Sequence, residues 1–175
     1  MSNQRTAPIP IDLARSQLLA SIYAIAATEI VSLDDACGRI AAETITSLID
    51  LPQTHNAAVD GYGVDSGELA AAPHKPFNII GVARAGHPFD GVIGAGEAIE
   101  IYTGAVMPSG PDCVAMHEDC SRTGDAVVIA AKLSKASNMR PSGENLAKGE
   151  IVVTKGQAIT AALVGQLAAS GTTQI

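Results

Sequence analysis

Apolar residues recur at three- and four-residue spacing near both ends of the chain, and in short runs between them. The segment from Ile11 to Ala26 has its apolar stripe at this spacing, with Asp12 in an acidic first turn. Such residues share one face of a helix, so the pattern predicts an amphipathic helix over Ile11 to Ala26. A second helix is predicted from Thr160 to Ser170, ended by Gly171.

The segment after the first helix mixes signals. Residues 29–33 favour a short strand, whereas Ser32 and Asp35 have the spacing of a capping box. We therefore expect one turn of helix that begins after Ser32 and is closed by Gly38. Residues 40–49 fit either a helix or a strand.

Residues 51–140 consist of short apolar runs separated by Gly, Pro, Asp and Ser, which is typical of strands and turns. The predicted strands lie near Asp60–Val64, Phe77–Arg84, Ala98–Tyr102, Cys113–His117 and Ala126–Ala131. A hairpin-like pair follows around Glu150–Thr154. The fold class predicted is α+β and mostly β, with residues 1–50 and 140–175 joined in one domain and residues 51–139 inserted as a compact β-rich domain.

Composition narrows the function classes. The 175 residues are 47% hydrophobic, enough for one good core or two small ones, and the net charge is −7. The few Lys and Arg are scattered, which argues against binding to nucleic acid or to an anionic membrane. No apolar run reaches the length of a membrane span, and residues 1–8 lack an apolar signal core, so a cytoplasmic soluble protein is expected.

Three cysteines, Cys37, Cys113 and Cys120, form no C-x-x-C pair and are odd in number, which disfavours a disulfide framework. Cys113, His117 and Cys120 are close in sequence, and a metal site is one interpretation. The simpler interpretation is that Cys113 and His117, having the same parity in a strand, face one side of a sheet.

Two segments combine glycine with polar residues between β-type residues, where a backbone can approach a ligand closely. In Leu51–Val64, Asp60 precedes Gly61; its carboxylate could accept a proton, bind Mg²⁺ or orient a ligand hydroxyl. Asp-Gly is equally a common turn pair. In Ile101–Gly110, Thr103 and Gly104 could present a hydroxyl and N–H groups to an oxyanion, or could simply end a strand.

Further candidates have similar alternatives. Asn56 could hold a ligand amide or an Asx turn, and Glu118 could bind Mg²⁺ or be solvated at a strand end. Arg140 and Glu144 could form an ion pair that fixes the crossing between the two domains, and such a surface pair would contribute at most about 1 kcal/mol.

Four blocks of the sequence resemble the N-terminal half of the MoeA family: Leu51–Val64, Ala85–Gly91, Glu100–Glu118 and Asn138–Asn145. That family comprises molybdopterin molybdenumtransferases and includes the gephyrin E domain. Its pattern has four blocks in the same order: L-P-x-F-D-N-S-A-M-D-G-Y-A, A-G-x-P-F-x-G, R-I-M-T-G-A-x-x-P-x-G-A-D-A-V-V-x-x-E and N-x-R-x-x-G-E-D.

The resemblance implies an elongated dimerisation domain with an inserted β domain, insertion of molybdate into adenylylated molybdopterin, Mg²⁺ and a homodimer. It places catalytic roles on Asp60 and Thr103. Substrate-binding roles would fall on Asn56, Gly61, Gly104, Arg140, Glu144 and Asn145, and a metal-binding role on Glu118. The family's pterin-binding α/β domain and C-terminal β domain have no counterpart here, so we expect them from further residues or from a partner chain, and expect this chain alone to be inactive.

Several polar positions depart from the family pattern. Thr54-His55 stands for Phe-Asp, Glu100 for Arg, and Asn145 for the last Asp. An acidic Glu100 beside Thr103 should repel a phosphate or molybdate anion. Two alternatives follow: a non-catalytic MoeA-like scaffold or interaction module, which these changes favour, and a small-ligand-binding β module, suggested by the pattern Lys148–Gly156.

Overall fold

The computed structural model describes residues 8–23 and 25–175. Residues 1–7, on which the expectation about a signal segment depends, and Ala24 within the predicted first helix lie outside the described part. Contacts group the chain into two units, Met1–Ile30 and Val31–Ile175. The predicted division at residues 50 and 140 stays a prediction.

Helix α1 (Ile11–Ala20) begins at the predicted residue but ends earlier than Ala26. Its end is satisfied locally, because the Ser21 hydroxyl donates to the Leu18 carbonyl at 2.7 Å. None of its residues is buried, so no packing within the unit extends the helix. In the described residues, no helix is long and apolar enough to cross a membrane.

The segment predicted as a strand at residues 29–33 contributes only an isolated bridge, between Ser32 and Gln174. Helix η1 (Leu33–Asp35) is a 3₁₀ turn. Ser32 precedes it as predicted, but its hydroxyl donates to the Asp35 carboxylate at 3.0 Å instead of accepting a backbone N–H. Gly38, with a φ of 85°, follows as expected of a residue in the left-handed region.

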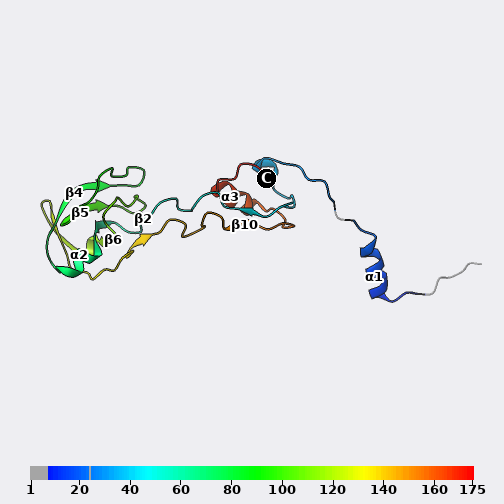
Figure 1. Ribbon diagram of the computed structural model, residues 1–175, viewed down its shortest axis with the longest axis horizontal. Coiled ribbons are helices and arrows are strands. Elements are labelled where there is room, and N and C mark those ends of the chain that lie inside the picture. Colours follow the sequence, from blue (N-terminus) through cyan, green and yellow to red (C-terminus); the bar gives the residue numbers. More distant parts are fainter. Residues whose placement is uncertain (1–7, 24) are drawn as a thin grey trace, which may run out of the picture. The chain divides into compact units, whose positions relative to one another are not determined.

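The outer segments meet through an antiparallel pair of short strands, β1 (Ile45–Thr46) and β10 (Ile151–Val153). Of the two alternatives for residues 40–49, the strand is therefore the one found, at Ile45–Thr46. Helix α3 (Ala161–Ala169) follows, with the Thr160 hydroxyl accepting the Leu163 N–H at its start. Leu167 of α3, Val153 and Ile159 belong to one buried apolar cluster of this region. Figure 1 shows α3 beside β10.

The middle of the chain forms a six-stranded sheet in the order β6-β3-β5-β4-β8-β7. All neighbours in it are antiparallel except β4 and β5, which are parallel. The strands are β3 (Gly61–Val64), β4 (Phe77–Ala83), β5 (Glu97–Ile101), β6 (Cys113–Met116), β7 (Cys120–Thr123) and β8 (Ala126–Ile129). Five of these six match predicted runs; β7 was missed, since its sequence Cys-Ser-Arg-Thr has one apolar residue.

Successive side chains of this sheet enter two separate apolar clusters, as the strand period requires. Cys113 and Ala115 of β6 belong to the first cluster, and Val114 between them belongs to the second. Helix α2 (Ser66–Ala71), which the pattern did not predict, adds Leu69 to the first cluster. Its start has a missed capping signal, because the Asp65 carboxylate accepts the Glu68 N–H at 2.8 Å.

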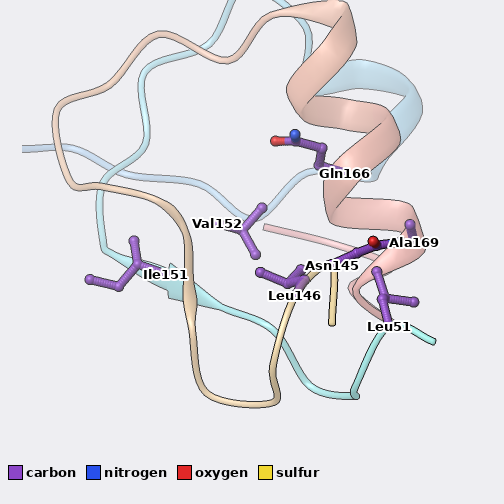
Figure 2. Close-up of a pocket in the computed structure, with 7 residues that line it drawn as sticks. All are labelled: Leu51, Asn145, Leu146, Ile151, Val152, Gln166 and Ala169. Carbon is purple, nitrogen blue, oxygen red and sulfur yellow. The ribbon is translucent and has the colours of Figure 1, made fainter. Parts of the chain in front are cut away.

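A further short pair joins β2 (Asn56–Ala57) to β9 (Met139–Arg140), with Asn56 opposite Arg140. The last 3₁₀ turn is η2 (His117–Asp119). A hollow of about 270 Å³ lies near α3 and β10. Figure 2 shows the residues that line it, which are Leu51, Asn145, Leu146, Ile151, Val152, Gln166 and Ala169.

Gly61 gives a direct test of sheet packing. A Cβ at this position would overlap the Ala115 carbonyl of β6. We expect Gly61→Ala to lower the free energy of unfolding by about 1–3 kcal/mol, because the neighbouring backbone must shift. The measurement is urea unfolding followed by circular dichroism.

Gly165 is the matched control, since its Cβ would meet no atom of the described residues within 4 Å. Gly165→Ala should raise the free energy of unfolding by about 0.5–1 kcal/mol, because Ala favours an exposed helix position. Equal stability of the Gly61→Ala and wild-type proteins would contradict the close approach of β3 and β6.

Candidate functional site

The two principal candidates, Asp60 and Thr103, are in direct contact. Asp60 immediately precedes β3, Thr103 follows β5, and the strand register pairs Gly61 with Ile101. The Thr103 N–H and the Thr103 hydroxyl both donate to Oδ1 of Asp60, each at 2.7 Å. The antiparallel pairing thus brings together two polar groups that the sequence separates by 43 positions.

These bonds set the ionisation of Asp60. The Thr103 N–H, and then the Thr103 hydroxyl, lower the pKa of Asp60 below its ordinary value of 3.8, because both favour the charged carboxylate. Both side chains are exposed. No hydrogen bond from the described residues reaches Oδ2 of Asp60, so an anionic oxygen faces solvent beside the Thr103 hydroxyl.

Asn56 and Gly104 lie next to this pair. The Asn56 side-chain amide donates to the Gly104 carbonyl at 3.2 Å, and the Thr54 hydroxyl donates to Oδ1 of Asn56 at 2.6 Å. Gly104 has a φ of 82°, which a residue with a side chain rarely adopts. In this structure Asn56 holds the turn that presents Thr103 through a bond to a residue 48 positions away, which is not the local Asx turn of the sequence alternative. Gly61 lies within the same region of the sheet, where its lack of a side chain admits the β6 backbone.

The predicted ion pair between Arg140 and Glu144 is present. Nε of Arg140 contacts Oε2 of Glu144 at 2.7 Å, and Nη2 of Arg140 donates to Oδ1 of Asn145 at 3.0 Å. Both ionic side chains are largely exposed. This group is joined to Asn56 through the pairing of β2 with β9, so the predicted substrate-binding residues fall in two connected groups.

The candidate metal ligands are more dispersed. Glu118 is exposed in η2, and the described residues contain no cluster of three or more His, Cys, Asp or Glu side chains suited to hold a metal ion. Burial raises the pKa of Cys113 to about 12 and that of Cys120 to about 11. The Cys113 thiol donates to the Val64 carbonyl at 3.4 Å.

Glu100 is paired with two neighbouring side chains. The Tyr102 hydroxyl donates to its Oε1 at 2.9 Å, and Nη1 of Arg122 contacts its Oε2 at 2.9 Å. Burial opposes ionisation, but these hydrogen bonds and the charge of Arg122 outweigh it and lower the pKa of Glu100. The guanidinium from β7 therefore offsets the repulsion that an acidic residue here would exert on an anion.

Aromatic rings surround this ion pair. The His117 ring packs edge-on against Tyr62, with centroids 5.0 Å apart, and against Tyr102, with centroids 6.2 Å apart. Nε2 of His117 is buried without a hydrogen bond in the described structure. Cζ of Arg84 lies 5.5 Å from the centroid of the Tyr102 ring, a cation–π contact.

Sequence reasoning missed these neighbours for different reasons. The contact of Tyr102 with Glu100 could have been predicted, because residues two apart lie on the same face of an extended segment. Tyr62 is directly opposite Glu100 in the register of β3 and β5. Arg122 and Arg84 gave no signal, since a single basic residue in a polar strand or turn is usually solvated.

The Asp60–Thr103 contact predicts a pH effect. Thr103→Val removes the hydroxyl but keeps the N–H, so the pKa of Asp60 should rise while staying below 3.8. Because the folded-state pKa is the lower one, the stabilisation from this contact is present above the unfolded pKa and is lost as pH falls through the folded pKa. Thr103→Val should bring the folded-state pKa of Asp60 closer to its unfolded-state pKa, so the pH range over which stability is lost becomes narrower.

The measurement is an NMR pH titration of the Asp60 carboxyl carbon. Thr123→Val, which removes a hydroxyl from β7, should leave the pKa of Asp60 as in the wild type. An unchanged pKa in Thr103→Val would show that the hydroxyl does not bind the carboxylate in solution.

The Glu100–Arg122 pair predicts a charge-swap result. Glu100→Arg alone should destabilise the fold, because it places two guanidinium groups together. The double variant Glu100→Arg/Arg122→Glu should recover part of the loss, with a coupling of about 0.5–1 kcal/mol, since the Arg122 side chain is 42% exposed. Urea unfolding of the wild type, Glu100→Arg, Arg122→Glu and the double variant measures this coupling.

The Arg140–Glu144 pair provides the comparison, with side chains that are 48% and 41% exposed. Swapping its charges should give a smaller coupling, because solvent screens both groups. A coupling at Glu100–Arg122 no larger than at this pair would contradict a specific ion pair.

Comparison with known proteins bears on this arrangement. The model of the MoeA N-terminal region (domain I and II) matches residues 9–171. A molybdopterin molybdenumtransferase of Haemophilus influenzae is 33% identical over 168 residues, covering 95% of this chain and 41% of the relative. One of Staphylococcus aureus is 30% identical over 171 residues, covering 96% and 41%. The chain thus spans about two fifths of the length of these curated relatives.

Solved structures agree. The molybdopterin biosynthesis MoeA protein of Pyrococcus horikoshii, in two crystal structures, has a TM-score of 0.86 and is 30% and 32% identical to this chain. Each match covers 95% of this chain, and 43% or 45% of the other. Since the family model matches nearly the whole chain, the resemblance seen in the sequence is confirmed, and this chain belongs to the family of the MoeA N-terminal region.

Proposed function

We propose that this chain forms the N-terminal part of a molybdopterin molybdenumtransferase, a cytoplasmic enzyme of molybdenum cofactor biosynthesis. In this proposal the complete protein inserts molybdate into adenylylated molybdopterin. The supporting observation is that Asp60 and Thr103, distant in sequence, share two hydrogen bonds at an exposed edge of a MoeA-type fold. The chain supplies this edge, and the pterin-binding domain comes from further residues or from a partner chain.

The Asp60–Thr103 edge suits polar substrates for a physical reason. The carboxylate is held anionic by two donors to Oδ1, which leaves Oδ2 for a ligand hydroxyl, a water molecule or a cation. Thr103, fixed by its own bonds to Asp60, can accept a hydrogen bond at its hydroxyl oxygen. Asn56 keeps the adjoining turn in place, so these groups are preorganised before a ligand binds.

At this edge, Mg²⁺ would be bound jointly by the protein and by substrate phosphates. The described residues offer no cluster of three or more metal-binding side chains, and Mg²⁺ commonly uses one or two carboxylates together with substrate phosphates and water. Asp60 would supply one ligand through Oδ2, and the ion would neutralise phosphate charge. Glu118, exposed in η2, is the second carboxylate candidate.

A homodimer is the proposed assembly, with the outer segments as its contact. Ile151 of β10 and Leu48, two residues after β1, are each 55% exposed. Helix α3 carries exposed small residues along most of its length, and the hollow in Figure 2 is lined mainly by apolar side chains. Such surfaces are suited to close helix packing against another chain.

The proposal predicts a loss of activity on mutation. In a protein that joins this chain to the pterin-binding domain, Asp60→Asn should reduce molybdate insertion about a hundredfold, because the amide keeps the shape but lacks the charge. Thr103→Val should have a smaller effect in the same direction. The measurement is conversion of adenylylated molybdopterin with release of AMP.

Lys155→Gln is the control, because Lys155 lies in the turn after β10 and should leave the rate unchanged. The isolated chain should show no turnover. Wild-type rates in Asp60→Asn would refute the proposed role of this edge.

A further inference from the structure

Arg84 is placed against the candidate site by backbone contacts. The Tyr102 N–H donates to the Ala83 carbonyl at 3.1 Å, which aligns the end of β4 with the segment that leads to Thr103. A Cβ on Gly104 would lie 3.6 Å from the Cβ of Ala85. The residues on both sides of Arg84 are therefore adjacent to the Tyr102–Gly104 turn.

The guanidinium of Arg84 rests over the ring of Tyr102, at 5.5 Å from its centroid. Tyr102 is itself fixed, because its hydroxyl donates to Glu100, and Glu100 is paired with Arg122. A chain of contacts thus runs from β7 through β5 to the turn after β4. It restrains the Tyr102 ring, and so provides a preorganised platform for the cation.

Arg84 differs from Arg122 in its hydrogen bonds. Arg122 donates to Glu100 and to the Gly124 carbonyl. Within residues 8–23 and 25–175, no hydrogen bond or salt bridge is made by the Arg84 guanidinium, and the residue is exposed. Its five N–H donors therefore remain available in the fork geometry that matches an oxyanion.

We propose that Arg84 binds a tetrahedral oxyanion, phosphate or molybdate, at the Asp60–Thr103 edge, with Tyr102 as its platform. This inference rests on the proposed function, since it assigns the anion-binding residue of the same site. The edge then has two complementary parts. Arg84 holds the oxyanion, and Oδ2 of Asp60 binds a hydroxyl or a cation that accompanies it. The positive charge that the family pattern places at position 100 is supplied here from the turn after β4.

The test is an NMR titration of the whole chain with sodium molybdate and, separately, with sodium phosphate, at ionic strength held constant with chloride. Saturable shifts are expected at the Arg84 Nε–Hε group and at the Thr103 and Gly104 amides. Arg84→Gln should weaken the affinity about fivefold or more, as loss of a charge-assisted bond implies. Tighter molybdate binding would assign the subsite to the metal oxyanion, and tighter phosphate binding to the nucleotide phosphate.

Lys155→Gln is the matched control, because it removes the same charge from the turn after β10. If both variants weaken oxyanion affinity equally, the effect comes from the net charge of the protein and the proposal is overturned. Shifts of the same size with chloride alone, or no saturable shifts in the wild type, would overturn it as well. Preserved amide dispersion in each variant verifies that the fold is intact.

Two substitutions test the platform. Tyr102→Phe keeps the ring and loses the bond to Glu100, whereas Tyr102→Leu removes the ring. Affinity should therefore fall in the order wild type, Tyr102→Phe, Tyr102→Leu. Wild-type affinity in Tyr102→Leu would refute the role of the ring.

Failure of this inference can be told apart from failure of the proposed function. In a protein that includes the pterin-binding domain, activity of Arg84→Gln with unchanged KM values for both molybdate and adenylylated molybdopterin would refute the role of Arg84 and leave the function standing. Oxyanion binding that depends on Arg84, with no molybdate insertion by that protein, would support the inference and refute the function.

Discussion

The close approach of β3 to β6 is the constraint on which the candidate site depends. Gly61 leaves room for the Ala115 carbonyl, and any side chain at this position would occupy the same space. With β3 held between β5 and β6, the residue before it, Asp60, lies beside the residues that follow β5. A packing requirement in the sheet thus positions the carboxylate that the chemistry would use.

Electrostatic compensation is the second organising feature. Asp60 and Glu100 are both held as anions, the first by donors from Thr103 and the second by Tyr102 and Arg122 despite its burial. The charge of the acidic residue at position 100 is therefore offset by its ion pair with Arg122. A change of charge within a family motif has to be judged with the residues that the fold places against it.

Much of the fold was predictable because local signals and packing agree. Alternating apolar runs marked five strands of the sheet, and Thr160 and Gly171 marked the ends of α3. Other elements were missed or given wrong bounds. The stripe in α1 was read past Ser21, whose hydroxyl satisfies the helix end, and β7 has too few apolar residues to be recognised. The capping residue of α2, Asp65, was visible in the sequence and was missed.

The sequence by itself determined the family and the mainly β character, and it marked Asp60, Thr103 and Gly61 as candidates, because motif spacing and strand periodicity are local properties. Only the tertiary structure decided which partner each polar group has. The bond between Thr103 and Asp60 joins residues 43 apart, and the pair of Arg122 with Glu100 joins residues 22 apart on strands that are not neighbours in the sheet. Such contacts follow from sheet order and curvature, which arise from the packing of the whole domain and have no signature in any single segment.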